Sequence, residues 1–410
     1  MARSHHTSSA GALSVLLVDH TATISGAEVS LLDLIAGLGV EHRVTVAVPQ
    51  GSLADAARAV GATVREIPAV EGSLRLDPTA TLFTLGAILR AAVAIRRAAR
   101  VVRADVVHAN SFRAGLAACL AAGLGAPRPL VHIRDCLPAS RAAKATQRVL
   151  SRSARTIIAN SAFTAACFDG APAGAPITVV HNPIDLNRFN PERIDRARAR
   201  AEHELAAERI VLVVLAQITP WKGQDTAIHA TRLLLDRGYD VELLIAGSVK
   251  FRRPLTRYDN DAYLQELHAA VDRLHLEDAV RFEGEVRNAP SLLRAADYVL
   301  VPSWAEPWGR VIAEAMAMGT PVIATNAGGP TELIDHAHNG LLVPPRDPAA
   351  WADAIERLIG DPELHRRMTD LAHKTARRFD RDTHVEAILK LYREAAAGRT
   401  EMPLSNNARG

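Results

Sequence analysis

The architecture of this chain is most evident in the stretch Pro302–Glu332, PSWAEPWGRVIAEAMAMGTPVIATNAGGPTE. It follows the apolar run Tyr298–Val301 and has the pattern of a strand, a loop, a helix, a second strand and a glycine loop. The helix is expected over Arg310–Met318. Glu306 then lies just past the first strand and flanks the helix N-terminus, while Glu314 lies more than one turn inside the helix.

The expected helix start lies between the two carboxylates and is suited to an anion. The first N–H groups of a helix lack intrahelical partners and carry partial positive charge. The backbone of Gly309, Arg310 and Val311 can therefore hold a phosphate, with Gly309 allowing close approach. Carboxylates accept hydroxyl hydrogen bonds, which suits a ribose on one side of a diphosphate and a sugar on the other. Glu306 and Glu314 could also be solvated helix charges, but with the loop they favour a nucleotide-sugar site.

The alternation of short apolar runs with segments of helical period continues in both directions, as in βαβ units on a parallel sheet. The pattern stops after residue 185 and restarts at residue 210, so two sheets are expected. Open α/β sheets bind ligands at the carboxyl ends of their strands, so two Rossmann-like, doubly wound domains should face a central cleft. The expected strands are Leu13–Asp19, Arg43–Val48, Thr63–Ile67, Asp105–Ala109, Pro129–Ile133, Arg155–Ala159, Ile177–Val180, Ile210–Ala216, Val241–Ala246, Val280–Glu283, Tyr298–Val301, Pro321–Ala324 and Gly340–Val343.

The residues of the opening stretch resemble the retaining nucleotide-sugar glycosyltransferases of family four, also called glycosyl transferases group 1, which have the two-domain GT-B architecture. The resemblance extends from about Leu13 to about Tyr392 and rests on several spaced elements rather than on one short pattern. Those elements are Glu306 and Glu314 with seven residues between them, the run Met318–Val322, Gly328-Gly329 and Glu332.

The resemblance implies a division of labour along the chain. Residues 1–185 would bind the acceptor and residues 210–378 the nucleotide-sugar, with a solvated linker rich in Arg and Glu over 186–209. A C-terminal helix over 379–396 would cross back to the first domain, and a disordered tail is expected over 397–410. The implied activity is retaining transfer of a sugar from a nucleotide-diphosphate-sugar, a UDP- or GDP-sugar before others, to a hydroxyl of an unidentified acceptor.

The resemblance also implies roles for individual residues of the second domain. Lys222 would bind the diphosphate, Glu314 the ribose hydroxyls and Glu306 the donor sugar, which makes Glu306 a candidate catalytic residue. Gln217 stands where the family often has an Arg, so neutralisation of the diphosphate would rest on Lys222 and the helix start at Gly309, with Arg310 or Arg134 as a further cation. The full donor-binding set is Gln217, Lys222, Gly223, Gly309, Arg310, Val311 and Glu314.

In the first domain, Gly26, Ala27 and Glu28 resemble the family's glycine loop near the acceptor and the donor phosphates. His132 ends an expected strand on the cleft side and is the second candidate catalytic residue, because it matches the family's histidine that touches the donor sugar. A purely structural histidine is an equally open interpretation of this position.

No metal and no other cofactor is expected, because the resemblance implies that fixed cations and helix dipoles stabilise the departing nucleotide diphosphate. The acidic run Asp259-Asn260-Asp261 is better interpreted as a helix cap than as a metal site. The sequence has no motif of P-loop NTPases, dinucleotide-binding dehydrogenases or serine hydrolases. Three alternatives stay open: a non-hydrolysing nucleotide-sugar epimerase, a retaining phosphorylase and a two-lobed sugar-binding protein.

Composition excludes other classes of protein. A length of 410 residues is about 2.7 times the usual domain length, which favours two domains. The net charge of +3 gives no electrostatic footprint for nucleic acid. No apolar run has the length of a membrane span or the form of a secretory signal. Cys119, Cys136 and Cys167 form no CxxC pair and fit a reducing cytoplasm, where we expect the protein.

The charge is unevenly distributed between the two halves. Residues 1–185 hold 18 basic and 12 acidic residues, whereas residues 186–410 hold 30 and 33. The segment Thr81–Val102 has the pattern of an apolar-rich helix with four arginines. Such a helix can bind an anionic membrane surface, so peripheral contact with the inner face of a membrane is one expectation; a packed helix with a solvated Arg face is the other.

Overall fold

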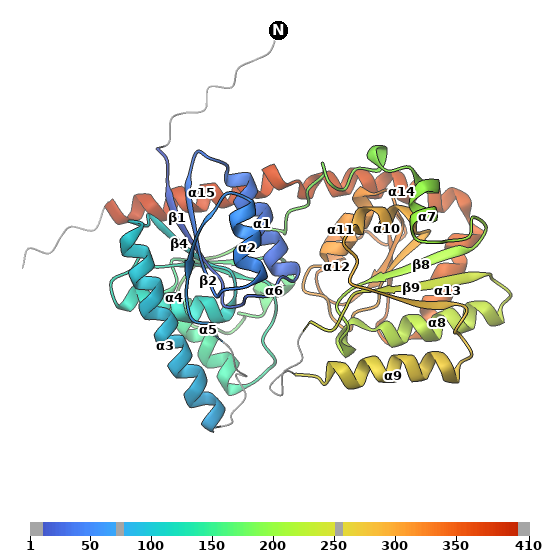
Figure 1. Ribbon diagram of the computed structural model, residues 1–410, viewed down its shortest axis with the longest axis horizontal. Coiled ribbons are helices and arrows are strands. Elements are labelled where there is room, and N and C mark those ends of the chain that lie inside the picture. Colours follow the sequence, from blue (N-terminus) through green and yellow to red (C-terminus); the bar gives the residue numbers. More distant parts are fainter. Residues whose placement is uncertain (1–10, 71–77, 251–256, 401–410) are drawn as a thin grey trace, which may run out of the picture.

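The computed structural model describes residues 11–70, 78–250 and 257–400, which form two α/β domains side by side (Figure 1). Each domain is built on one sheet of parallel strands. The expected fold class, two Rossmann-like domains, is confirmed. Of the tail expected to be disordered, residues 397–400 belong to the last helix, α15 (Arg381–Thr400), and residues 401–410 lie outside the described part of the chain.

The sheet of the first domain has the strand order β3-β2-β1-β4-β5-β6-β7. β1 pairs with β2 on one side and with β4 on the other, so the order reverses between β1 and β4. Ligands bind at such a switch point, beyond the carboxyl ends of the strands. The strands are β1 (Ser14–Val18), β2 (Arg43–Val48), β3 (Thr63–Glu66), β4 (Val106–Ala109), β5 (Leu130–Ile133), β6 (Thr156–Ala159) and β7 (Ile177–Val179).

Two apolar cores hold the helices of this domain against the two faces of its sheet. One core is shared by α1 (Gly26–Leu38), α2 (Ser52–Ala59) and α15. The other is shared by α3 (Pro78–Val101), α4 (Phe112–Gly123) and α5 (Arg141–Ser153). Across residues 11–70, 78–250 and 257–400, no helix combines the length and apolarity that spanning a bilayer requires.

The sheet of the second domain has the order β10-β9-β8-β11-β12-β13, with its switch point between β8 and β11. Its strands are β8 (Ile210–Leu215), β9 (Val241–Ala246), β10 (Val280–Gly284), β11 (Tyr298–Val301), β12 (Val322–Thr325) and β13 (Leu341–Val343). Its helices are α8 (Gln224–Asp236), α9 (Asn260–Arg273), α10 (Ala289–Ala295), α11 (Arg310–Ala317), α12 (Pro330–Leu333), α13 (Pro348–Gly360) and α14 (Pro362–Ala376). Asp259 accepts a hydrogen bond from the Ala262 N–H at 3.0 Å and caps α9, as expected.

The segment 186–209 differs from the expected solvated linker, because it packs on the second domain. It contains α7 (Arg196–Glu202), which contacts α10. Arg196 and Arg200 both pair with Asp297, at 2.6 and 3.1 Å. Asp297 is far from both arginines in the sequence, so the sequence alone shows only a run of charged residues, which indicates solvent exposure. In the structure these ion pairs neutralise the arginine charges. The segment also gives three side chains to the apolar core of the second domain, those of Phe189, Ala199 and Leu205.

The chain passes between the domains twice, and the two passages run side by side. The Ile184 N–H donates to the Phe379 carbonyl at 2.8 Å, and the Arg381 N–H donates to the Ile184 carbonyl at 3.1 Å. From Arg381 onward, α15 returns to the first domain and packs against α1 and β4 (Figure 1). Its side chains in the apolar core of that domain are Val385, Ile388 and Tyr392.

Tyr392 should contribute strongly to stability because it is fully buried and its hydroxyl lies 2.6 Å from His108 Nδ1. We expect Tyr392→Ala to lower the free energy of unfolding by about 3–5 kcal/mol through the cavity that it leaves. Tyr392→Phe, which removes only the hydrogen bond, should cost about 1–3 kcal/mol. Urea unfolding followed by circular dichroism measures both, and the exposed Glu386→Ala on the same helix is the control. Equal stability of all three variants would mean that α15 does not pack on the first domain.

Candidate active site

An ion pair at the carboxyl ends of β8 and β11 forms the centre of the site in the second domain. Lys222 ends a 3-10 turn after β8, and its Nζ lies 2.7 Å from Oε2 of Glu306, in the loop after β11. The same oxygen accepts a hydrogen bond of 2.7 Å from Ser303 Oγ. The two charged side chains are only 16% and 8% exposed. The structure thus brings Lys222 and Glu306 together where the strand order reverses.

Glycines allow the backbone to approach closely around Glu306. Gly309 precedes α11 with φ of +90°, a conformation that side chains rarely adopt. Gly328 has φ of +92°, and a Cβ there would collide with the Glu306 carbonyl. That carbonyl accepts the Gly329 N–H at 2.8 Å, and the Glu306 N–H donates to Ala327 at 3.1 Å. The glycine loop after β12 therefore packs directly on the Glu306 loop and fixes its position.

Two other residues of the expected donor set lie between β8 and α8. Gly223 has φ of +71°, and a Cβ at this position would collide with the Pro302 carbonyl at the end of β11. The carbonyl of Gln217 accepts a hydrogen bond of 2.9 Å from Gln224 Nε2, and Gln217 is half-buried. Because its side chain is neutral, Gln217 adds no second positive charge to the site beside that of Lys222.

Arg310 and Glu314 lie one turn apart on α11 and contact each other, with Arg310 Nη2 3.1 Å from Glu314 Oε1. The other end of the guanidinium reaches the first domain. Its Nη1 donates to Ser30 Oγ at 2.8 Å and to the Pro183 carbonyl at 2.9 Å, and it pairs with Asp33 at 3.1 Å. The backbone of Arg310 stays at the helix start, but its side chain bridges the two domains.

Gly26, Ala27 and Glu28, expected to form a glycine loop, are instead the first turn of α1, which lies against α11 of the second domain. Gly26 is exposed, and a Cβ there would lie 3.8 Å from Arg310 Cδ. Glu28 is buried, and its carboxylate accepts hydrogen bonds from both the backbone N–H and the hydroxyl of Ser25. Burial raises the pKa of Glu28 above its usual value. Glu28 therefore caps its own helix, which leaves Gly26 as the residue of this first turn most open to a ligand.

A hydrogen-bonded network joins three strand ends beside the start of α1, and our sequence analysis names only one of its members, Arg134, as a cation for the diphosphate. Asp19, after β1, is fully buried and accepts a hydrogen bond of 2.7 Å from Asn110 Nδ2, after β4. Asn110 Oδ1 in turn accepts one of 2.8 Å from Arg134 Nε, after β5, and Arg134 also donates to Asn182. Burial lowers the pKa of Arg134 to about 10, so it stays charged. Asp19, Asn110 and Arg134 each follow a strand at its carboxyl end, which is the signal that could have revealed them.

His132 lies inside the first domain rather than on the cleft. It is fully buried, and its ring stacks on those of His108 and of His384 from α15, with centroids 5.4 and 6.3 Å apart. Burial and the charge of Arg134 hold the pKa of His132 well below its usual value, so the ring is neutral. No edge of His132 is open to a ligand in this structure. Arg134, which follows β5 and lies two residues after His132, is the charged side chain at this end of the strand.

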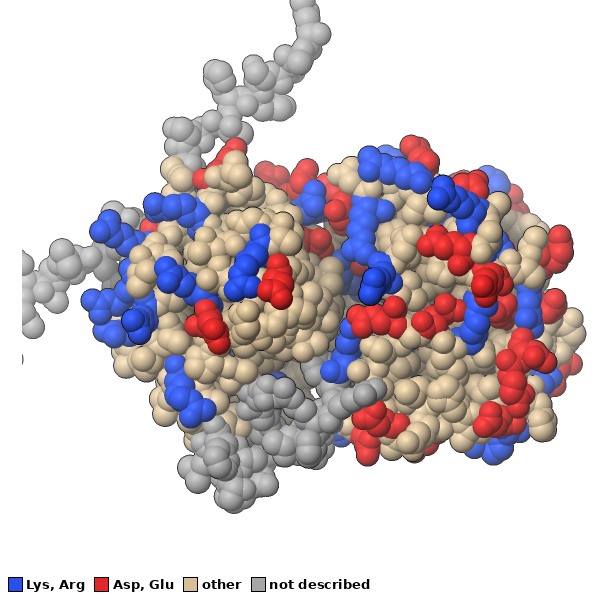
Figure 2. Space-filling model, viewed as in Figure 1, with Lys and Arg blue, Asp and Glu red and all other residues tan. Residues whose placement is uncertain are grey.

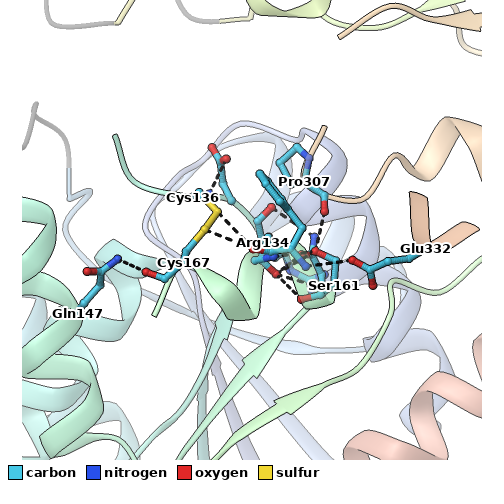
Figure 3. Close-up of a disulfide and its surroundings, with 11 residues drawn as sticks. Arg134, Cys136, Gln147, Ser161, Cys167, Pro307 and Glu332 are labelled. Carbon is cyan, nitrogen blue, oxygen red and sulfur yellow. Dashed lines mark hydrogen bonds between the residues drawn. A yellow bond between two sulfur atoms is a disulfide. The ribbon is translucent and has the colours of Figure 1, made fainter. Parts of the chain in front are cut away.

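The loop after β6 carries contacts that cross between the domains (Figure 3). Ser161 Oγ donates to the Pro307 carbonyl at 2.7 Å. The N–H groups of Ala162 and Phe163, at the start of α6 (Ala162–Ala166), donate to Glu332 at 2.9 and 3.0 Å. Partial burial favours a higher pKa for Glu332, but these N–H groups and His181 outweigh it and hold the pKa below its usual value. The Glu332 carboxylate therefore stays charged in its contact with the first domain.

Cys136 and Cys167 form a disulfide close to these contacts, with their Cα atoms 6.0 Å apart (Figure 3). It joins the loop after β5 to the end of α6. Cys119 is buried on α4 and is free. The spacing of the three cysteines does not indicate this pairing, because 31 residues separate two members that the fold brings together.

Comparison with known proteins places the chain in a family. Residues 24–188 match the model described as Glycosyltransferase Family 4, and residues 195–375 match that of Glycosyl transferases group 1. The D-inositol 3-phosphate glycosyltransferase of Streptomyces griseus subsp. griseus is 30% identical over 90% of this chain and 83% of its own length. The chain belongs to glycosyltransferase family 4. The matched relatives are named glycosyltransferases, which gives no support to the epimerase alternative.

Other family-4 relatives match over shorter lengths. The D-inositol 3-phosphate glycosyltransferase of Saccharomonospora viridis is 34% identical over 56% of this chain, which spans about half (52%) of that relative.

Among solved structures, HepE of Anabaena in complex with UDP-glucose is 26% identical, with a TM-score of 0.79 over 92% of this chain and 99% of its own. Sucrose-phosphate synthase of Thermosynechococcus elongatus, 20% identical with a TM-score of 0.77 over 94% of this chain and 100% of its own, shares the fold.

With one disulfide and one free cysteine, the number of reactive thiols should depend on whether the protein is unfolded and reduced. Unfolding without a reductant should release one reactive thiol per chain, that of Cys119, and reduction should raise the number to three. The native protein should react slowly, because burial raises the pKa of Cys119 to about 12. Titration with a thiol reagent measures all three states. A Cys119→Ser control should bring the unreduced count to zero, and three thiols before reduction would show that Cys136 and Cys167 are unpaired.

Proposed function

We propose that this family-4 chain transfers a sugar from a nucleotide-diphosphate-sugar to an acceptor hydroxyl. The observation that supports this best is the ion pair of Lys222 and Glu306, held beside the start of α11 at the switch point of the second sheet. A cation and a helix N-terminus together suit a diphosphate. The adjoining carboxylates suit the hydroxyl groups on either side of it.

Each part of the donor has a candidate partner among these residues. Lys222 would turn from Glu306 to the diphosphate, joined by the backbone N–H groups at Gly309, Arg310 and Val311. Glu306 would then accept hydrogen bonds from the donor sugar. Glu314, which is buried on α11 and bonded to Arg310, would hold the ribose. Gly26 and Arg134 would form the first-domain wall, and this role passes from His132 to Arg134 because His132 is enclosed.

UDP is the nucleotide that we favour, because HepE, with its similar fold, is in complex with UDP-glucose. The acceptor would lie against the first domain, beside the network of Asp19, Asn110 and Arg134.

We propose that transfer retains the anomeric configuration and needs no metal ion. The acceptor oxygen would bond to the anomeric carbon on the face from which the diphosphate leaves, and its proton would pass to a departing phosphate oxygen. Lys222 and the N-terminus of α11 supply the positive charge that a departing diphosphate requires.

Removing the Lys222 charge should weaken both donor binding and turnover. In a thermal-shift panel of UDP-, GDP-, ADP- and dTDP-glucose, UDP-glucose should raise the melting temperature most, and the shift should vanish in Lys222→Ala. With any acceptor that is turned over, kcat/KM of Lys222→Ala should fall about 100- to 1000-fold. The exposed Lys374→Ala on α14 is the matched control and should behave as the wild type. Near-normal turnover in Lys222→Ala would refute the assignment.

A single reaction tests the metal and the stereochemical proposals together. Transfer from UDP-glucose in excess EDTA should proceed at the rate seen without the chelator, because Lys222 and the helix start replace a cation. The NMR spectrum of the product should show the anomeric configuration of the donor. Loss of activity that Mg²⁺ or Mn²⁺ restores would overturn metal independence, and an inverted product would overturn retention.

A further inference from the structure

The outer face of the first domain carries a charge pattern that the donor site does not explain. Helices α3, α4 and α5 lie next to one another on one side of the sheet, and we call this surface the α3–α5 face. The three helices carry nine Lys and Arg residues and no Asp or Glu. On the opposite side of the sheet, α1, α2 and α15 carry acidic residues as well as basic ones. The positive charge of the first half is thus concentrated on one face.

Most of these charges point into solvent without compensation. Seven of the nine side chains are exposed, and none of the seven forms an ion pair with another residue in the described ranges. They are Arg90, Arg97, Arg100, Arg141, Lys144, Arg148 and Arg152. Figure 2 shows basic side chains set among uncharged ones on the outer side of the first domain, where α3 lies.

Exposed apolar side chains gather on the same face. Among the described residues, the exposed large apolar side chains all lie in the first domain. Those on α3, α4 and α5 or at their carboxyl ends are Leu85, Leu89, Val93, Val101, Leu120, Leu124 and Val149. Solvent reaches 50% of Leu85, 56% of Leu89 and 57% of Val93. A surface that is both apolar and uniformly basic is unusual for a helix layer that only solvent covers.

Three of the exposed apolar residues of α3 form a continuous stripe. Leu85, Leu89 and Val93 are spaced four residues apart, so they lie on one side of the helix over about 12 Å of its length. Arg90 and Arg97 lie beside this stripe, and Arg100 continues it. The 24 residues of α3 span about 36 Å, far more than a four-residue strand, so the helix projects past the sheet. Its first turns extend beyond the carboxyl ends of the strands (Figure 1).

We propose that the α3–α5 face docks on an anionic lipid bilayer. Anionic headgroups would neutralise the arginines and Lys144, while Leu85, Leu89 and Val93 enter the boundary between headgroups and acyl chains. The aliphatic stems of the arginines cover apolar surface and leave their charged ends in the headgroup layer. This goes beyond the proposed function, because sugar transfer itself needs no membrane.

Other occupants fit this face less well. A second copy of the same face would bring seven exposed cations against seven more, and like charges across an interface oppose association. Nucleic acid would neutralise the charge but would leave the stripe of Leu85, Leu89 and Val93 without an apolar partner. An anionic bilayer offers both kinds of partner in one surface.

Flotation of the full chain with lipid vesicles tests the proposal. The protein should float with vesicles of phosphatidylcholine and phosphatidylglycerol, and stay behind with vesicles of phosphatidylcholine alone. High salt should weaken the binding, because it screens the headgroup charge. Equal binding to both kinds of vesicle, or binding to neither, overturns the proposal. The donor-induced thermal shift is independent of either result, so failure here leaves the proposed function standing.

Variants separate the two parts of the surface. Each Arg near an anionic leaflet strengthens binding about fivefold, so a combined Arg90→Glu, Arg97→Glu and Arg100→Glu change should weaken it by at least about 100-fold. A combined Leu85→Ser, Leu89→Ser and Val93→Ser change should weaken it at least about tenfold.

Matched controls change the same residue types elsewhere on the first domain. Lys390→Glu with Arg393→Glu, on the exposed side of α15, controls for charge, and Val40→Ser with Val60→Ser controls for exposed apolar area. Both controls should bind as the wild type, and all variants should keep its melting temperature, because every changed side chain is exposed. Equal loss in the controls would show that net charge or general surface apolarity, and not the α3–α5 face, binds the vesicles.

Discussion

The contact between Lys222 and Glu306 organises the second half of the cleft. Lys222 follows β8 and Glu306 follows β11, the two neighbouring strands between which the strand order reverses. At such a switch point the loops after the strands run in opposite directions and leave room for a ligand. Taking a Lys and a Glu out of water is costly unless the pair is well bonded. Ser303 bonds the Glu306 carboxylate, while Gly328 and the N–H of Gly329 approach the Glu306 backbone carbonyl and fix its position. The glycine loop and the start of α11 are thus arranged around one residue.

The sequence predicted the framework far better than the directions of side chains. Each expected strand is present with its ends within one residue. The central strands of both sheets are buried on both faces and so form continuous apolar runs between turn residues, whereas the edge strands β3 and β7 are largely exposed. His132 was placed on the correct strand, but local sequence cannot show that α15, some 250 residues later, covers that face. Arg310 was placed at the correct helix start, but its partners Ser30 and Asp33 belong to the other domain.

The two walls of the cleft are built differently. On the first-domain side, Asp19, Asn110 and Arg134 bond the ends of three strands to one another, and the disulfide of Cys136 ties the adjacent loop to α6. Between the domains, polar contacts join Arg310 to Ser30 and Asp33, Ser161 to the Pro307 carbonyl, and the carboxylate of Glu332 to the start of α6. Polar contacts of this kind exchange with water more readily than an apolar interface does, which suits a cleft that must admit and release ligands.

The side-by-side passage of the chain at Ile184 and at Phe379–Arg381 restricts how that exchange can occur. Two backbone segments that are hydrogen-bonded to each other at one edge would act as a single hinge, about which the second domain rotates rather than slides. Because α15 continues from this hinge into the core of the first domain, the axis is anchored in one lobe over the length of a helix. Opening would therefore move the Lys222 and Glu306 wall as a unit and leave its internal geometry unchanged.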